Sequence, residues 1–241
     1  MIPLFKLIYD IEEFVYPPLC PICENEIKES KIVCQRCFDN IHFVSRKQCK
    51  ICGKPIKRGK ICIKCKKNRP SFDTIISCGS YVPPLSDIIK LYKFKNRPSL
   101  SVKLARKLYT TFNSHADIKD IEHITWVPMR RVEIRERGYN QSQLLAFEFS
   151  RISSLESIDL LYKSKNIPSQ TTLPYEKRIN NVKNAYKIRK QALNLFKENS
   201  KKGIILIDDV FTTGSTLNEC AKRLKETGFK KVIGLVLATS P

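Results

Sequence analysis

The sequence is poor in acidic residues and has no long apolar stretch. It contains 23 Asp and Glu against 44 Lys and Arg, which gives a formal net charge of +21. Such an excess predicts a polyanionic partner: a nucleic acid, an anionic membrane surface or a phosphorylated ligand. No apolar run approaches the ~20 residues that span a bilayer. The first residues turn acidic at Asp10 and lack the small-residue cleavage site of a signal peptide, so we expect a cytoplasmic protein.

The positive charge is clustered. Residues 46–69 contain eleven Lys and Arg, residues 90–107 contain seven, and neither stretch has an acidic residue. A genome bias toward Lys is an alternative cause of the charge, but clustering argues against it as the whole cause. In the second stretch, Tyr92 and Phe94 alternate with Lys93 and Lys95. Aromatics interleaved with lysines can stack on bases and contact phosphates, or the two rings can anchor a helix to a sheet; the sequence leaves both readings open.

Eight of the ten cysteines form four CxxC pairs. Two such knuckles complete one tetrahedral Cys₄ site for zinc, and closed sites of this kind are structural. We predict two successive zinc ribbons, with a crossed pairing of the same eight thiols as the alternative. The ligands are Cys20, Cys23, Cys34 and Cys37 for the first site, and Cys49, Cys52, Cys62 and Cys65 for the second. Cys78 and Cys220 have no CxxC partner and are expected to be buried.

Residues 204–216 read as a buried strand, a short loop and the start of a helix. Four apolar residues lead into Asp208 and Asp209, and hydroxyl residues around Gly214 follow. The carboxyl ends of parallel strands are where open α/β sheets bind ligands, and helix N-termini favour phosphate. The chain has no G-x-x-x-x-G-K-[ST] motif, which argues against a P-loop NTPase. The pattern predicts a site for a sugar phosphate.

The remaining pattern predicts a mostly parallel α/β sheet flanked by helices. We expect a zinc-ribbon domain over residues 1–69, opened by an amphipathic helix over 4–15, and an α/β domain over 70–241. Expected strands cover residues 74–82, 124–128, 158–162, 204–207 and 231–238. Expected helices cover 85–108 with a break near Arg97, a stretch from 141, 191–198, and 216–228 with a Thr216–Glu219 capping box. Residues 164–177 read as a long loop of the kind that serves as a lid.

Residues 204–216 resemble the phosphoribosyl diphosphate (PRPP) signature of type I phosphoribosyltransferases: apolar run, two acids and a Thr-Thr-Gly-Ser-Thr loop. Nearly the whole chain resembles the ComF family of competence proteins, the ComFC proteins of natural transformation. The matching features are the cysteine knuckles, residues 92–95, Val127-Pro128 leading into residues 137–141, and Gln170 followed by Arg178, Asn181, Ala185 and Tyr186.

The resemblance implies a type I phosphoribosyltransferase fold behind the zinc ribbons, and roles for particular residues. Asp208 and Asp209 would be the catalytic pair that holds the ribose hydroxyls. The PRPP-binding segment would be Asp208, Asp209, Val210, Phe211, Thr212, Thr213, Gly214, Ser215 and Thr216. The pyrophosphate loop would be Pro128, Met129, Arg130 and Arg131. Mg²⁺ would accompany PRPP.

Three functions follow from this resemblance. The first is a competence protein that binds single-stranded DNA and PRPP during DNA uptake, with uptake machinery at the inner membrane face as a further partner. The second is an active PRPP-dependent phosphoribosyltransferase with an unknown acceptor. The third is a PRPP-binding regulator without turnover.

Overall fold

The computed structural model of the protein describes residues 18–27, 32–41, 48–115, 120–164, 184–193 and 202–240. The expected helix over residues 4–15, almost all of the expected lid and most of the helix expected at 191–198 lie outside these ranges. Within them, no helix is long and apolar enough to cross a membrane.

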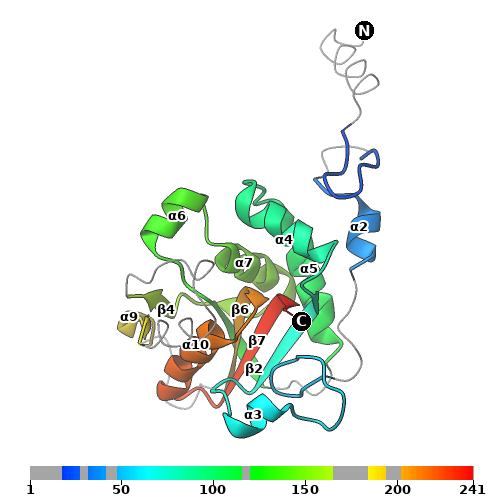
Figure 1. Ribbon diagram of the computed structural model, residues 1–241. Coiled ribbons are helices and arrows are strands. Elements are labelled where there is room, and N and C mark those ends of the chain that lie inside the picture. The colour runs from blue at the N-terminus through cyan, green and yellow to red at the C-terminus, as the bar shows by residue number, and fades with distance from the viewer. Residues whose placement is uncertain are drawn as a thin grey trace.

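A five-stranded parallel sheet in the order β1-β7-β6-β2-β3 forms the centre of the molecule (Figure 1). The strands of this sheet are β1 (Thr74–Ser80), β2 (Ile121–Trp126), β3 (Glu156–Ser157), β6 (Gly203–Phe211) and β7 (Lys231–Thr239). β4 (Leu161–Lys163) and β5 (Tyr186–Ile188) pair antiparallel in a separate small sheet. The predicted α/β class with a mostly parallel sheet is confirmed.

Helices cover both faces of the sheet. α4 (Leu85–Phe94), α5 (Leu100–Asn113) and α7 (Gln141–Ser153) pack on one face, and α10 (Ser215–Glu226) packs on the other. The other described helices are α2 (Gln35–Asp39), α3 (Ile63–Lys67), α6 (Arg131–Arg137) and α9 (Lys190–Leu193). Side chains of β6 alternate between two cores because successive residues of a strand point to opposite faces. Ile205 and Ile207 pack with residues of α4, α5 and α7, and Ile204 and Leu206 pack with residues of α10. β6 is therefore buried on both faces, as its continuous apolar run predicts.

The two cysteine-rich segments pack on different parts of the α/β domain. Phe38 of the first segment belongs to the same apolar cluster as Leu104 of α5, with the Lys103 ammonium 5.0 Å from its ring centre. The second segment covers the edge strand β1. There the Ile75 N–H donates to the Ile51 carbonyl (2.8 Å), and the Thr74 hydroxyl donates to the Lys50 carbonyl (2.8 Å). This contact supplies backbone partners to an otherwise open edge.

Two sequence expectations about elements are wrong. The strand expected over residues 158–162 does not form as one element: β3 ends at Ser157, and only Leu161 and Tyr162 lie in a strand, β4 of the small sheet. The arginine-rich stretch from Arg131, for which the sequence predicts no element, forms helix α6, which has no buried residue and hence no apolar period. The Thr216–Glu219 capping box does not form. Glu219 instead accepts hydrogen bonds from the Asn184 N–H (3.0 Å) and from Arg223 (2.7 Å).

Candidate functional site

A cavity of about 1010 Å³ lies at the carboxyl ends of the neighbouring strands β2 and β6. Its lining combines segments that are far apart in the sequence: residues 93–96 and 127–142, each in part, residues 208–217, and the single residues Lys163 and Tyr186. Every residue of the predicted PRPP segment 208–216 lines it, as do Pro128, Met129 and Arg130. Arg131, the first residue of α6, is exposed and is not among the described residues of the lining.

The loop after β2 is held beside Asp208 by backbone pairing. The Val127 N–H donates to the Ile207 carbonyl (3.0 Å), and the Asn140 side-chain amide donates to the Val127 carbonyl (3.1 Å). Asn140 also caps α7, because its side-chain oxygen accepts from the backbone N–H groups of Ser142 and Gln143. A single buried residue therefore fixes both the loop at 127–130 and the start of α7 against β6.

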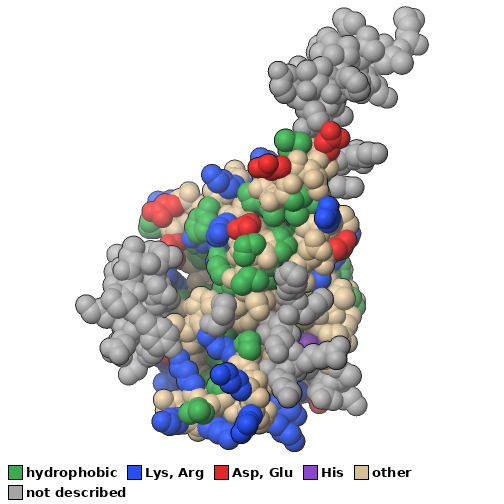
Figure 2. All heavy atoms as spheres, turned by 45° about the vertical axis from the view of Figure 1, so that its right-hand side comes forward, with side chains coloured by type: hydrophobic (Ala, Val, Ile, Leu, Met, Phe, Trp, Pro, Cys, Tyr) green, Lys and Arg blue, Asp and Glu red, His purple; other side chains and the backbone are tan. Residues whose placement is uncertain are grey.

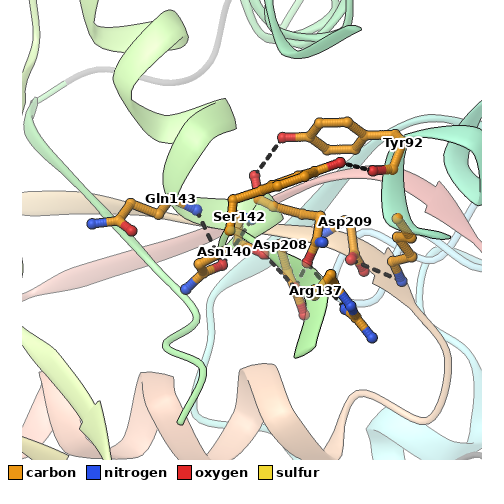
Figure 3. A network of polar contacts seen from close by, with 10 residues as sticks. Tyr92, Arg137, Asn140, Ser142, Gln143, Asp208 and Asp209 are labelled. Carbon is orange, nitrogen blue, oxygen red and sulfur yellow. Dashed lines mark hydrogen bonds and ion pairs between the residues drawn. The ribbon is translucent and has the colours of Figure 1, made fainter. Parts of the chain in front are cut away.

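Asp208 and Asp209 occupy different surroundings although they are adjacent (Figure 3). The Asp208 carboxylate accepts from the Ser142 hydroxyl (2.9 Å) and from the Asp209 backbone N–H (2.9 Å). The Asp209 carboxylate pairs with the Lys93 ammonium at 2.8 Å, and the two side chains are only 13% and 18% exposed. Lys93 thus contributes a positive charge to the acidic end of the cavity.

The surroundings of Asp208 favour its protonated form. Burial, and then the negative charge of Asp209, raise the pKa of Asp208 to about 7, although Lys93 and the two hydrogen bonds act in the opposite direction. The carboxyl of Asp208 therefore exchanges its proton close to neutral pH.

The loop of residues 212–216 is shaped by Gly214. Gly214 has φ +80° and precedes α10, and a Cβ at this position would lie 2.6 Å from the ring of Phe211. The Thr213 hydroxyl lies 2.8 Å from the Ser215 hydroxyl and accepts from the Ser215 N–H at 3.2 Å. Phe211 is buried and packs edge-on against Phe72, with the ring centres 5.9 Å apart. The loop is thus built on an aromatic ring that leaves no room for a side chain at 214.

Two basic residues of the lining, Arg130 and Lys163, are held by Glu133. Glu133 accepts from the Arg130 backbone N–H (2.8 Å) and from Lys163 (2.8 Å), and it also pairs with the Arg130 guanidinium (3.2 Å). Burial raises the pKa of Glu133, but the hydrogen bonds from Lys163 and Arg130 outweigh burial, so its pKa is lowered. Glu133 stays ionised and holds Arg130 and Lys163 at the cavity.

The sequence did not point to several residues of this site. Ser142, Glu133 and Lys163 belong to no apolar run and no spacing motif, so the sequence pattern does not indicate them. The position of Ser142 in the first turn of a helix that follows a strand end is the one signal that could have indicated it. Lys163 reaches the cavity from β4, an element whose place outside the main sheet was not expected.

The two cysteine clusters have the composition and spacing of zinc sites. Each brings four Cys sulfurs within 4.8 Å of one another, in the predicted sequential pairing. The separations Cys20–Cys37 (3.9 Å) and Cys52–Cys62 (3.8 Å) match the ~3.8 Å edge of a tetrahedron with Zn–S bonds of ~2.3 Å. Burial raises the pKa of Cys20, but backbone N–H groups of Cys34, Ile22 and Cys23 outweigh burial and bring it to about 6. The donor set therefore fits structural Zn²⁺.

Cys78 and Cys220 are fully buried, as expected. Burial raises the pKa of both thiols, that of Cys78 to about 12, so neither is a reactive thiolate.

Basic side chains gather at the lower end of the molecule in Figure 2, the end at which Figure 1 places α3 of the second cysteine segment. The exposed Lys and Arg of this segment are Lys50, Lys57, Arg58, Lys60, Lys64, Lys66, Lys67 and Arg69. No Asp or Glu occurs between residues 48 and 72. This surface has the charge of a polyanion-binding face.

The cavity therefore joins two kinds of chemistry. Carboxylates at one end can accept hydrogen bonds from neighbouring hydroxyls. The loop of residues 212–216, the start of α10 and the basic groups of Arg130 and Lys163 can bind phosphate groups. A ligand that carries both hydroxyls and phosphates would match this arrangement.

Comparison with known proteins agrees with these features. Residues 11–66 match the family described as Double zinc ribbon domain. Competence protein F of Haemophilus influenzae is 31% identical over 217 residues, which cover 83% of this chain and 93% of that protein. The DNA utilization protein YhgH of Escherichia coli is 26% identical over 216 residues, which cover 87% of this chain and 85% of that protein.

Among solved structures, a glutamine PRPP amidotransferase from B. subtilis aligns with a TM-score of 0.40 at 15% identity. The alignment covers 62% of this chain and 30% of that chain.

Proposed function

The chain belongs to the ComF family of competence proteins, and we propose that it acts in DNA uptake by binding PRPP in the cavity beside Asp208 and single-stranded DNA on its basic surfaces. The names of its relatives, a competence protein and a DNA utilization protein, support the role in DNA uptake. The cavity supports the PRPP part of the proposal, and the basic surface of the second cysteine segment supports the DNA part.

The observation that carries the PRPP part is the convergence of residues 208–216 with Pro128, Met129 and Arg130 on one cavity. PRPP has a ribose diol, a 5′-phosphate and a 1′-diphosphate. In the proposed arrangement Asp208 and Asp209 accept hydrogen bonds from the diol, and the loop from Thr212 to Thr216 binds the 5′-phosphate at the start of α10. Arg130 and the backbone beside it bind the diphosphate.

Mg²⁺ is the cation that we propose for this complex. It keeps much of its water and binds through one or two carboxylates together with substrate phosphates. Asp208 and Asp209 are the carboxylates that could contact the ion or its water. The ion would neutralise the diphosphate, and the protein would supply the orientation.

Calorimetric titration of the zinc-loaded protein with PRPP, with and without Mg²⁺, tests this part. We expect one PRPP per chain with Mg²⁺ and weaker binding without it. Arg130→Gln should weaken binding of PRPP more than binding of ribose 5-phosphate, because the variant lacks a contact to the diphosphate alone. Equal losses for both ligands would contradict the assigned role of Arg130.

The DNA part is carried by the lysines and arginines of the second cysteine segment. Affinity for single strands depends on salt because phosphate contacts release counterions, with a slope of about −0.7 per contact in a log–log plot. A Lys57→Gln, Arg58→Gln, Lys60→Gln variant should therefore bind single strands more weakly, and its affinity should depend less steeply on salt. A matched triple change of Lys202, Lys222 and Lys230, which are exposed on the sheet or α10 side, serves as the control. Equal effects of the two triple changes would refute a specific role for the segment.

A second candidate function is an active phosphoribosyltransferase, and the raised pKa of Asp208 favours it. A carboxyl that titrates near pH 7 beside the ribose site can accept a proton from an incoming acceptor as pyrophosphate departs. Release of pyrophosphate from PRPP, screened over nucleobases and oligonucleotides, tests this candidate. Loss of release in Asp208→Asn with PRPP binding retained would support it, and binding without any release would favour the regulator.

A further inference from the structure

Phe94 is the exposed aromatic residue at the rim of the cavity. It ends α4, lines the cavity and is 62% exposed, whereas Tyr92 of the same segment is fully buried and donates to the Gln141 carbonyl (2.9 Å). The structure thus separates the two readings of this segment. Tyr92 anchors the helix, and Phe94 has no such anchoring role.

One face of Phe94 is occupied by a guanidinium. The central carbon of the Arg137 guanidinium lies 5.2 Å from the ring centre of Phe94, within the range of a cation–π contact. Arg137 is oriented by its hydrogen bond to the Gln141 side-chain oxygen (3.0 Å), and Gln141 is only 1% exposed. The hydrogen bond to Gln141 therefore orients the guanidinium against the ring. Together the two groups form an ordered planar surface.

The surroundings of this surface are basic. Lys95 and Arg97 are exposed and follow Phe94 in the sequence. Arg135, Asn96 and Gly138 line the cavity together with Phe94, and Glu136 is the one acidic residue of the stretch 135–138 in the lining. Scattered exposed apolar residues are common and need no explanation. An exposed aromatic ring that contacts a guanidinium and lines the same cavity as Arg135 and residues 212–216 has a more specific chemistry. It offers stacking for a planar base and charge for the flanking phosphates.

We propose that a nucleobase of single-stranded DNA stacks on Phe94 beside Arg137, at the mouth of the cavity that contains Asp208 and residues 212–216. This inference rests on the proposed DNA binding and adds a location to it. DNA enters the same cleft as PRPP, so that one base lies next to the PRPP site while the strand continues over basic side chains.

Binding of a 20-nucleotide oligo(dT) and of an abasic 20-mer to the zinc-loaded full chain tests the proposal. Phe94→Leu retains apolar bulk and removes the ring. Base–aromatic stacking corresponds to a loss of about 5- to 150-fold per base. We expect at least a fivefold loss of affinity for oligo(dT) in Phe94→Leu, no change for the abasic strand and an unchanged salt slope.

Phe147→Leu is the matched control, because Phe147 is an exposed ring (41%) on α7 that packs against Trp126 and not against a cation of the rim. It should leave oligo(dT) affinity unchanged. Phe94→Tyr should restore the affinity, since the ring returns. Zinc content and thermal unfolding show that each variant is folded.

Each other outcome overturns the proposal in a distinguishable way. A wild-type protein that binds no single strand removes the DNA part of the proposed function and this inference with it. A wild-type protein that binds oligo(dT), with Phe94→Leu binding equally well, overturns this inference alone. Equal losses for oligo(dT) and the abasic strand would assign Phe94 a packing role.

Discussion

Substitution of Gly214 tests how the loop of residues 212–216 is built. Gly214→Ala introduces two separate costs. A non-glycine residue at φ +80° is disfavoured by about 1–2 kcal/mol. The new Cβ would also lie 2.6 Å from the Phe211 ring, which is closer than real contacts allow, so the loop or the ring must move.

The second cost has a definable size because Phe211 cannot move freely. Its ring is 3% exposed and packs on Phe72 in the core, and overpacking of this kind typically costs about 1–3 kcal/mol. We therefore expect Gly214→Ala to lower the free energy of unfolding by about 2–5 kcal/mol.

Gly138→Ala provides the matched control. Gly138 has φ +87°, but its nearest outside atom, Asn96 Oδ1, is 3.8 Å from the added Cβ, an ordinary contact. This variant should show the backbone cost alone, about 1–2 kcal/mol. The difference between the two variants isolates the overlap with Phe211.

Urea unfolding, followed by the fluorescence of the single tryptophan, Trp126 in β2, measures both variants. Phe211→Leu should remove most of the overlap, so Gly214→Ala should cost less in that background by at least about 1 kcal/mol. Equal losses at Gly214 and Gly138, or strict additivity with Phe211→Leu, would refute the account of the loop.

Three further predictions concern charge and zinc. The pKa of Asp208 is raised from 3.8 to about 7, so the folded state binds this proton more tightly than the unfolded state does. The resulting stabilisation is fully present below about pH 4 and is lost as the pH rises to about 7. Asp208→Asn should therefore raise the free energy of unfolding at pH 7.5, as measured in urea. This increase in stability should be smaller by about 2 kcal/mol at pH 5.5. An increase that does not depend on pH would contradict the pKa assigned to Asp208. Lys93→Met should destabilise the protein by about 3–5 kcal/mol because it leaves Asp209 as an unpaired, largely buried charge. The double variant Lys93→Met, Asp209→Asn should recover most of that loss. A double variant no more stable than the single one would show that the ion pair is not the cause. Cys52→Ser should abolish protection of the Ile75 amide from hydrogen exchange, since its acceptor, the Ile51 carbonyl, lies in the knuckle of the second site. Cys23→Ser, in the first site, should leave this protection in place. Protection retained in both variants would mean that zinc does not hold the second cysteine segment on β1.

The sequence could predict the parts of the fold that depend on continuous patterns. The apolar run of β6 has its two faces buried, and the break between α4 and α5 falls where Arg97-Pro98 interrupts the helical pattern. The CxxC spacings predicted the pairing of the thiols because a knuckle is a local structure. The division between residues 69 and 70 stays a prediction, since the second cysteine segment packs directly on β1.

The rest depends on contacts between distant segments. The ion pair of Lys93 with Asp209 joins α4 to β6, and Lys163 reaches Glu133 from a hairpin whose second strand lies at residues 186–188. No local spacing encodes such contacts. The two readings of Tyr92 and Phe94 were equal in the sequence because both rings sit among lysines, and only the burial of Tyr92 against α7 distinguishes them.

The most direct measurement of the central claim is calorimetry of PRPP with Mg²⁺ on wild type, on Asp208→Asn, Asp209→Asn, and on Asp159→Asn. Asp159 is 48% exposed, pairs with Arg189 and lies outside the cavity lining, so the same chemical change there is a matched control. The account predicts one PRPP per chain for wild type and for Asp159→Asn, and at least a tenfold loss of affinity in the double variant. Undiminished binding in the double variant, or no binding to the zinc-loaded wild type, would contradict it.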